Sequence, residues 1–196
     1  MTTRLRGVVA AAATPLNADF SIDTDRLIEH CRALLAEGCD GINLLGTTGE
    51  ATSFSVEQRI AAMQAVARSG LPMSQFMVGT GAASLIDAVR LTREARDLHC
   101  SAALVLPPFY YKPIDNIGLL AYFDALINRV GADLRLYLYN FPQLSGVPYA
   151  LEFVQAVKEK YPRQLLGLKD SSGDTSYSIA MAAGVADFDV FPSAEG

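Results

Sequence analysis

Short apolar runs recur along the chain about every 30 residues, and amphipathic segments separate them. Such nearly continuous apolar runs are typical of parallel strands whose two faces are both covered. The same unit, a strand followed by a helix, repeats along the whole sequence, which favours a (β/α) barrel over a doubly wound sheet. The predicted strands are Gly7 to Thr14, Gly41 to Gly46, Phe76 to Thr80, Ala102 to Pro107, Leu134 to Asn140, Leu165 to Asp170 and Phe188 to Pro192.

The segments between these runs carry signals for the beginning of helices. Asp23 can cap a helix that Gly38 ends, and Ser55 with Gln58 forms a capping box. Ser84 is placed to cap a third helix. Further helices are predicted at Leu119 to Val130, at Pro148 to Tyr161 with proline in the first turn, and from Asp174 or Thr175 onward. We expect these helices to be the crossovers between parallel strands.

The number of predicted strands is one fewer than a closed barrel of this kind requires. A (β/α)8 TIM barrel has eight strands and about 250 residues, whereas this sequence has 196 residues. Either the sequence is a fragment, or another element covers the seam between the first and the seventh strand. An uncovered strand edge beside an apolar interior would favour aggregation, which favours a fragment. We therefore expect an α/β protein with a TIM barrel truncated after the seventh strand. It would form a single domain over residues 1–196, with the eighth strand and the C-terminal helices absent from this sequence.

The composition argues against several classes of partner. The net charge is -5 and the sequence pI is about 5.0, without a run of lysine and arginine, which disfavours a nucleic-acid surface. The 3 cysteines show no Cys-x-x-Cys spacing, so neither a disulfide framework nor a zinc site is expected, and a reducing, cytoplasmic location fits. No apolar run has the length of a membrane span. The expected partner is a small molecule, without a metal.

A single lysine stands at the end of the sixth apolar run. Leu165 to Leu168 has the pattern of a buried strand, Lys169 follows it, and Ser171 to Asp174 has the pattern of a loop. Desolvation at such a strand end lowers the pKa of a lysine and leaves its amine able to attack a carbonyl carbon. Lys169 is therefore a candidate for Schiff-base chemistry. The alternative is a lysine that extends into solvent from a strand end.

Other strand ends carry polar and aromatic residues, and the carboxyl ends of the strands form the active site of a barrel. Gly46, Thr47 and Thr48 can hold a carboxylate with hydroxyls and backbone amides, although Gly-Thr-Thr-Gly is also ordinary turn sequence. Tyr139 can transfer a proton, or it can be a buried tyrosine bound to a backbone carbonyl. Tyr110 has either a catalytic role or a place in a subunit contact.

A carboxylate site, a proton carrier and a reactive amine at successive strand ends suit chemistry on a 2-oxo acid. The sequence also resembles the dihydrodipicolinate synthase and N-acetylneuraminate lyase family of pyruvate-dependent class I aldolases. The resemblance extends over nearly the whole chain. Its motifs are Gly46-Thr47-Thr48-Gly49-Glu50, Val78-Gly79-Thr80-Gly81, Pro108-Phe109-Tyr110-Tyr111, Tyr139-Asn140-Phe141-Pro142 and Gly167-Leu168-Lys169-Asp170-Ser171-Ser172-Gly173-Asp174.

The resemblance implies roles for the residues in these motifs. It identifies Lys169 as the imine-forming lysine and Tyr139 as the catalytic tyrosine. Thr47 and Thr48 match the pair that holds the pyruvate carboxylate and links to the tyrosine. Tyr110 matches a tyrosine that completes the site from or near a neighbouring subunit. The resemblance further implies a homotetramer, built as a dimer of dimers, that uses no metal and no organic cofactor.

One position departs from the synthases of the family. Leu144 falls where synthases of the lysine pathway carry an arginine for the carboxylate of the aldehyde partner, and leucine cannot pair with a carboxylate. The segments Pro108 to Tyr111 and Tyr139 to Pro142 resemble instead the lyases and the 2-keto-3-deoxy sugar acid aldolases. Ser193 and Glu195 lie where the lyase branch has sugar-binding side chains.

The leading functional hypothesis is therefore a Schiff-base aldolase or lyase. Such an enzyme would reversibly cleave a 2-keto-3-deoxy acid to pyruvate and an aldehyde. Two alternatives stay open. One is dihydrodipicolinate synthase, which condenses pyruvate with aspartate semialdehyde, and the other is a non-catalytic relative that binds a 2-oxo acid.

Overall fold

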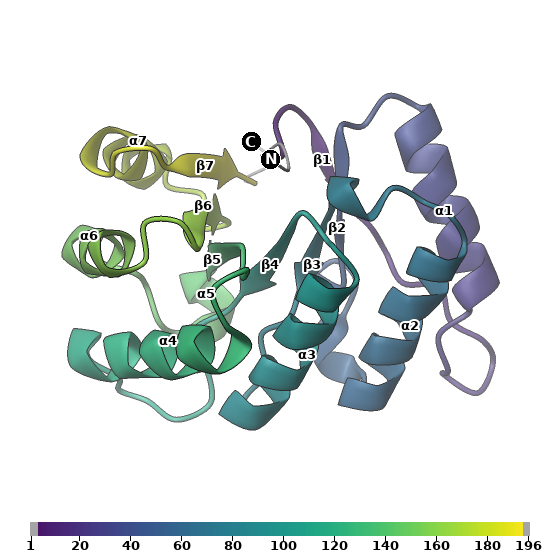
Figure 1. The fold of residues 1–196 in the computed structure, drawn as a ribbon, viewed down its shortest axis with the longest axis horizontal. Coiled ribbons are helices and arrows are strands. Elements are labelled where there is room, and N and C mark those ends of the chain that lie inside the picture. Colours follow the sequence, from purple (N-terminus) through teal and green to yellow (C-terminus); the bar gives the residue numbers. More distant parts are fainter. Residues whose placement is uncertain (1–3, 194–196) are drawn as a thin grey trace. The chain divides into compact units, whose positions relative to one another are not determined.

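Seven strands form one sheet in the order of the sequence, from β1 to β7, in a computed structural model that describes residues 4–193 (Figure 1). The strands β1–β2, β2–β3, β5–β6 and β6–β7 pair in parallel. A strand order without reversal is that of a (β/α) barrel. The predicted fold class is therefore confirmed. The strands are β1 (Val9–Ala11), β2 (Gly41–Leu44), β3 (Phe76–Gly79), β4 (Ala102–Val105), β5 (Leu136–Asn140), β6 (Leu165–Asp170) and β7 (Asp189–Pro192).

Helices follow the strands, and several begin where the sequence predicts. Asp23 accepts a hydrogen bond from the Arg26 backbone at the start of α1, and Ser55 with Gln58 forms both bonds of a capping box before α2. The helices are α1 (Thr24–Ala36), α2 (Val56–Arg68), α3 (Leu85–Asp97), α4 (Asn116–Val130), α5 (Pro142–Ser145), α6 (Leu151–Lys160) and α7 (Thr175–Gly184), with short 3-10 helices η1 (Ala51–Ser53) and η2 (Met73–Gln75).

Two helices begin at other residues than the prediction gives. The fourth helix begins at Asn116 rather than at Leu119, because the Asp115 carboxylate accepts from the Gly118 amide and caps an additional turn. The fifth predicted helix begins at Leu151 rather than at Pro148. The Tyr149 amide instead donates to Asn140 Oδ1 at 3.2 Å, which holds this segment against the end of β5.

A short helix, α5, was absent from the prediction. Pro142 occupies its first turn, where a missing amide hydrogen costs nothing. Gly146 ends it at φ 66°, a left-handed conformation that glycine adopts without strain. The helix has only 4 residues, so it leaves no apolar periodicity that a sequence pattern could reveal.

The chain divides into two compact units. The first contains the residues up to Thr80 together with Arg90–Ala103, and the second contains Gly81–Val89 together with the residues from Leu104 onward. In the first unit α1 packs against α2 and β2. Its core includes the fully buried side chains Leu27, Ile42, Leu44, Met63, Val66 and Phe76.

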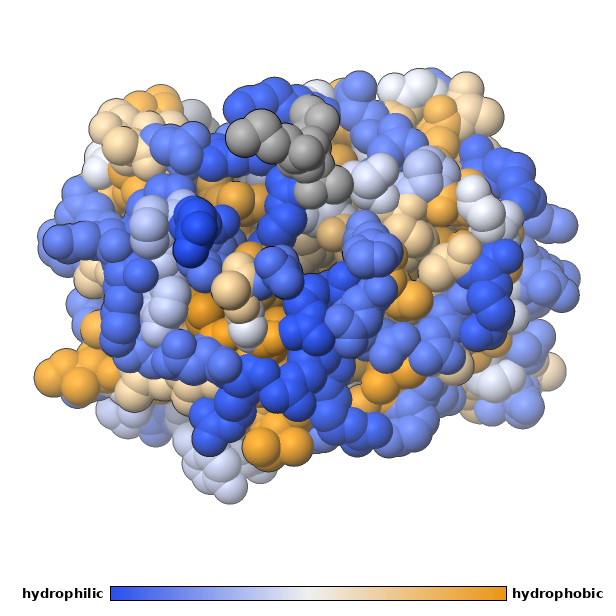
Figure 2. Space-filling model, in the orientation of Figure 1, coloured by the Kyte–Doolittle hydropathy of each residue, from blue (hydrophilic) through white to orange (hydrophobic). Residues whose placement is uncertain are grey.

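The second unit contains the strands β5 to β7 and the helices α4, α6 and α7. Figure 1 shows α6 and α7 on one side of β6 and β7, and α6 contacts both α4 and α7. Its core contains Phe123, Leu126, Leu138, Phe153, Val154 and Leu165. On the face of the molecule shown in Figure 2, hydrophilic residues predominate and hydrophobic residues are scattered among them. Over residues 4–193, no helix has the length and apolarity needed to cross a bilayer.

Candidate active site

Lys169 and Tyr139 lie level with each other on neighbouring strands of the second unit. The parallel register pairs Tyr139 of β5 with Lys169 of β6, so both side chains point to the same face of the sheet. Lys169 Nζ lies 5.0 Å from the centroid of the Tyr139 ring. The structure thus brings together the candidate nucleophile and the candidate proton carrier at the carboxyl ends of two strands.

Burial changes the acidity of the Lys169 amine. The strand before it is buried from Leu165 to Leu168, and Lys169 itself is only partly accessible. Desolvation disfavours the ammonium form and lowers the pKa of Lys169 from 10.5 to about 8. This is the direction expected for a lysine at the end of an apolar strand. A substantial fraction of the amine is therefore neutral close to physiological pH, which nucleophilic attack requires.

A chain of hydroxyl groups leads away from Tyr139. Ser171 Oγ donates to the Tyr139 hydroxyl at 3.4 Å and is hydrogen-bonded to Ser193 Oγ. The Ser193 backbone amide donates to the carbonyl of Asp170 at 2.7 Å. Ser193 therefore lies next to Ser171, which contacts the Tyr139 hydroxyl, whereas Glu195 is outside the described residues. Ser171 was not predicted as a site residue; it follows the end of β6, and its bond to the Tyr139 hydroxyl places it beside the pair.

The residues next to the reactive pair fasten the two strands together on the opposite face. Asn140 Nδ2 donates to Asp170 Oδ1 at 2.8 Å, and both residues are buried. Asp170 also accepts from the Ser178 hydroxyl at 2.7 Å and from the amide and hydroxyl of Ser172 at 3.0 Å each. Asp170 thus joins β5, β6, the following loop and α7. This network keeps β5 and β6 in the register that pairs Tyr139 with Lys169.

Replacing Asp170 by alanine is expected to destabilise the protein by about 3 kcal/mol, because buried donors on Asn140 and Ser178 lose their acceptor. Chemical denaturation measures this loss. Asp174→Ala is the matched control, since Asp174 caps α7 at an exposed site and its loss costs about 1 kcal/mol. Equal losses in the two variants would contradict a fastening role for Asp170.

Gly46, Thr47 and Thr48 lie in a tight loop after β2. The Glu50 amide donates to the Thr47 carbonyl at 2.9 Å, and both threonine side chains are exposed. Gly46 has no room for a side chain, because a Cβ there would lie 2.6 Å from Asn43 Oδ1. This loop belongs to the first unit, whereas Lys169 and Tyr139 belong to the second. A joint role of the threonines with the lysine stays a prediction.

Tyr110 lies in the segment between β4 and α4, in the second unit. Its side chain is 71% exposed, and its ring meets that of Tyr111 edge to face at 5.1 Å between centroids. This exposure fits a residue that acts in a contact with a second subunit, as one of the two sequence interpretations holds. Within the range 4–193, no group of three or more His, Cys, Asp or Glu side chains is arranged to hold a metal ion.

The fold and the site together define a class: a (β/α)-barrel protein with a desolvated lysine beside a tyrosine at the strand ends. Comparison with known families makes this specific. The chain belongs to the Dihydrodipicolinate synthetase family, whose sequence profile matches residues 4–191.

Individual relatives agree with this assignment. An "uncharacterized DapA-like lyase" of Chloroflexus aurantiacus is 41% identical over 88% of this chain and 58% of its own length. The crystal structure of dihydrodipicolinate synthase from Agrobacterium tumefaciens is 33% identical, with a TM-score of 0.91 over 95% of this chain and 65% of that one. A 2-keto 3-deoxygluconate aldolase from Picrophilus torridus is 26% identical, with a TM-score of 0.86 over 96% and 66%. The chain thus spans less than two thirds of the length of these relatives.

Proposed function

We propose that the protein is a lyase that forms an imine between Lys169 and pyruvate, and that it reversibly cleaves a 2-keto-3-deoxy acid to pyruvate and an aldehyde. The observation that carries this proposal is the lowered pKa of Lys169, about 8, together with the register that pairs Lys169 with Tyr139 on the neighbouring strand. A structural lysine needs neither feature. Membership in the family supports the same chemistry.

The proposed reaction uses the protonated imine formed by the Lys169 amine as an electron sink. The neutral Lys169 nitrogen attacks the keto carbon of the substrate, and water leaves to give a protonated imine. The Tyr139 hydroxyl supplies the proton that the departing water and the imine require, and the resulting phenolate then accepts the proton of the hydroxyl on the carbon beyond the bond that breaks. The electron pair of that bond moves into the imine, which yields an enamine and the free aldehyde. Protonation of the enamine and addition of water release pyruvate and restore the amine.

The other predicted residues complete this proposal. Thr47 and Thr48, with the backbone of Gly46, bind the pyruvate carboxylate, and their exposed position after β2 supports this. Ser193 and Glu195 bind the aldehyde part. No metal or organic cofactor takes part, since the imine itself withdraws the electrons.

The proposal also includes the assembly of the protein. The exposed Tyr110 completes the site across a subunit contact in a homotetramer, and the exposure of its ring supports that role. Sedimentation of the intact protein tests the tetramer.

Condensation of pyruvate with aspartate semialdehyde is the second candidate, and one contact favours it. Leu144, in α5, cannot bind the carboxylate of that aldehyde, and its side chain is 63% exposed. However, Lys112 Nζ donates to the carbonyl of the adjacent Ser145 at 3.1 Å. A cation therefore lies beside this helix and could take the place of the arginine that synthases carry.

Trapping with borohydride tests the proposal. The protein is incubated with pyruvate and borohydride, and the modified peptide is identified by mass spectrometry. The label is expected on Lys169. Labelling of another residue, or none in the intact protein, would overturn the proposal. If pyruvate raises the melting temperature equally in the wild type and in Lys169→Ala, the binding-protein alternative is favoured instead.

Two activity assays then separate the candidate reactions. A panel of neutral and polyhydroxylated aldehydes is offered with pyruvate, and carbon–carbon bond formation is followed. A coupled assay with aspartate semialdehyde tests the synthase reaction. Activity with aspartate semialdehyde that falls in Lys112→Met would favour the second candidate.

The rate of trapping is expected to depend on pH with a midpoint near the pKa of Lys169, about 8. Below this pH the ammonium form predominates and cannot attack, so the rate rises about tenfold per pH unit and levels off above the midpoint. The measurement is the initial rate of imine formation between pH 6 and pH 10. A midpoint near that of an ordinary lysine, 10.5, would show that Lys169 is not desolvated in solution.

A further inference from the structure

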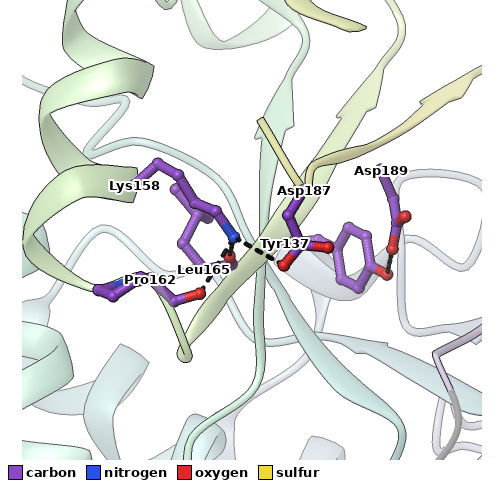
Figure 3. Close-up of polar contacts among 6 residues, drawn as sticks. All are labelled: Tyr137, Lys158, Pro162, Leu165, Asp187 and Asp189. Carbon is purple, nitrogen blue, oxygen red and sulfur yellow. Dashed lines mark hydrogen bonds and ion pairs between the residues drawn. The ribbon is translucent and has the colours of Figure 1, made fainter. Parts of the chain in front are cut away.

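Below the reactive lysine, a hydrogen bond spans two strand spacings. The Tyr137 hydroxyl of β5 donates to Asp189 Oδ2 of β7 at 2.7 Å, as Figure 3 shows. The strand between them is β6, and the register places Tyr137, Gly167 and Asp189 side by side. The phenol and the carboxylate therefore meet over Gly167.

Gly167 makes this contact possible. A Cβ at this position would lie 2.6 Å from Tyr137 Cε1 and 2.2 Å from the Asp189 carbonyl oxygen. Neither distance leaves room for a methyl group. Because glycine has no side chain, the Tyr137 ring can lie over β6 and reach the carboxylate on the far side.

Lys169 lies directly above this hydrogen bond along β6. It follows Gly167 by two residues, so its side chain points to the same face, and it pairs with Phe191 of β7. The Phe191 ring packs against the Tyr137 ring at 5.6 Å between centroids. The Tyr137–Asp189 pair is thus the layer of side chains immediately beneath the lysine on these three strands.

The charged and titratable groups around Lys169 on these strands can be assigned to faces. On its own face lie Tyr137, Tyr139 and Asp189, and Asp189 is the acidic residue among them. Asp170 points to the opposite face, where it bonds to Ser178 of α7. The remaining groups from the helices lie on that side too: Lys158 donates to the Leu165 and Pro162 carbonyls near Asp187, and Tyr177 donates to the Tyr149 carbonyl.

We propose that Tyr137 is a positioning residue for Lys169: its phenol holds the Asp189 carboxylate over Gly167, beneath the amine, and so limits the attraction of this negative charge for the protonated amine. The proposal rests on the proposed role of Lys169 as the imine-forming residue. Tyr137 and Asp189 do not touch the substrate. They act through the lysine.

The physical basis is the effect of a nearby opposite charge on a lysine. A carboxylate close to an ammonium stabilises the charged form and raises the pKa of the lysine. A hydrogen bond from a phenol distributes part of the charge of the carboxylate and fixes where it points. Without the phenol, the carboxylate would turn toward the cation above it, and the amine would be protonated over a wider pH range.

Tyr137→Phe tests this inference, because it removes one oxygen and keeps the ring between Gly167 and Phe191. The Lys169 pKa is measured by labelling with acetic anhydride across a pH series and quantifying the Lys169 peptide by mass spectrometry. The expected result is a rise of about one unit in the midpoint. The rate of pyruvate trapping at pH 7 should then fall up to tenfold.

Two further variants show whether the phenol acts through the carboxylate. Asp189→Asn is expected to leave the midpoint at or below the wild-type value, because the negative charge is gone. The double variant Tyr137→Phe with Asp189→Asn should match Asp189→Asn. Tyr177→Phe is the matched control, since it removes another hydrogen-bonded phenol in the helix layer and should not move the midpoint.

The outcome separates this inference from the proposed function. An unchanged midpoint in Tyr137→Phe, or an equal rise in the double variant, would overturn the positioning role. The labelling needs no pyruvate, so it reports on the lysine even if the wild-type protein traps none. Trapping in the wild type together with an unchanged midpoint in Tyr137→Phe would leave the proposed function standing and refute the role of Tyr137.

Discussion

Replacing Lys169 by methionine is expected to abolish the trapping of pyruvate and, at the same time, to make the protein more stable at neutral pH. Methionine has nearly the volume of the lysine stem but no amine. Covalent capture therefore ends, and turnover should fall on the order of a thousandfold or more. Borohydride trapping and steady-state assays measure both losses.

The gain in stability follows from the lowered pKa of Lys169, about 8 when folded against 10.5 for an ordinary lysine. Below pH 8 both the folded and the unfolded chain carry the ammonium, and the folded state bears the full cost of burying it. Between pH 8 and 10.5 the unfolded chain binds more protons, so stability rises with pH in this window. Methionine removes this dependence and should add up to about 3 kcal/mol at pH 7.

Thermal and chemical unfolding of Lys169→Met at pH 7 and at pH 10 checks this expectation. Lys160→Met is the matched control, because Lys160 is half exposed, bonds to Asp124 and has a raised pKa. It should not gain stability at pH 7. A loss of stability in Lys169→Met would mean that burial of this amine does not destabilise the folded state.

Gly167→Ala is expected to have the largest effect on folding. The added methyl group would stand 2.2 Å from the Asp189 carbonyl oxygen, and backbone cannot move away unless β6 and β7 separate. It would also displace the Tyr137 ring from over β6. We expect a loss of more than about 4 kcal/mol, which urea unfolding would measure, or an insoluble protein.

Gly173→Ala provides the comparison within the same motif. Gly173 has φ +77°, which an alanine tolerates poorly, but no atom lies within 4 Å of the position of its Cβ. Its cost should be about 1 to 2 kcal/mol from backbone strain alone. If Gly167→Ala proved as mild as Gly173→Ala, the close approach of β6, β7 and Tyr137 would be refuted.

The sequence predicts the strands of this protein better than its short helices. Each apolar run contains one strand, because a strand covered on both faces needs an unbroken apolar segment, as in Leu165–Asp170. Helix starts with polar caps, such as Asp23 and Ser55, were also legible. The short α5 was not, since proline and glycine mark its ends without any periodicity between them.

The sequence likewise predicts some residues of the candidate site and not others. Lys169 and Tyr139 could be placed at strand ends by counting residues along each apolar run. Their neighbours could not, because the bond between Asn140 and Asp170 depends on the register of two strands. The bond between Tyr137 and Asp189 depends in addition on a glycine in a third strand. Such pairings are properties of the assembled sheet, which a single segment does not encode.

Adjacent positions on β5 and β6 differ in function because they face opposite sides of the sheet. Tyr139 and Lys169 face the side where the reaction is proposed, while the bond between Asn140 and Asp170 joins the same strands on the other face. An engineer could therefore replace Tyr139 and Lys169 by other reactive groups and keep the Asn140–Asp170 bond that holds the strands in register. Other reactive side chains at positions 139 and 169 should then leave the pairing of the strands unchanged.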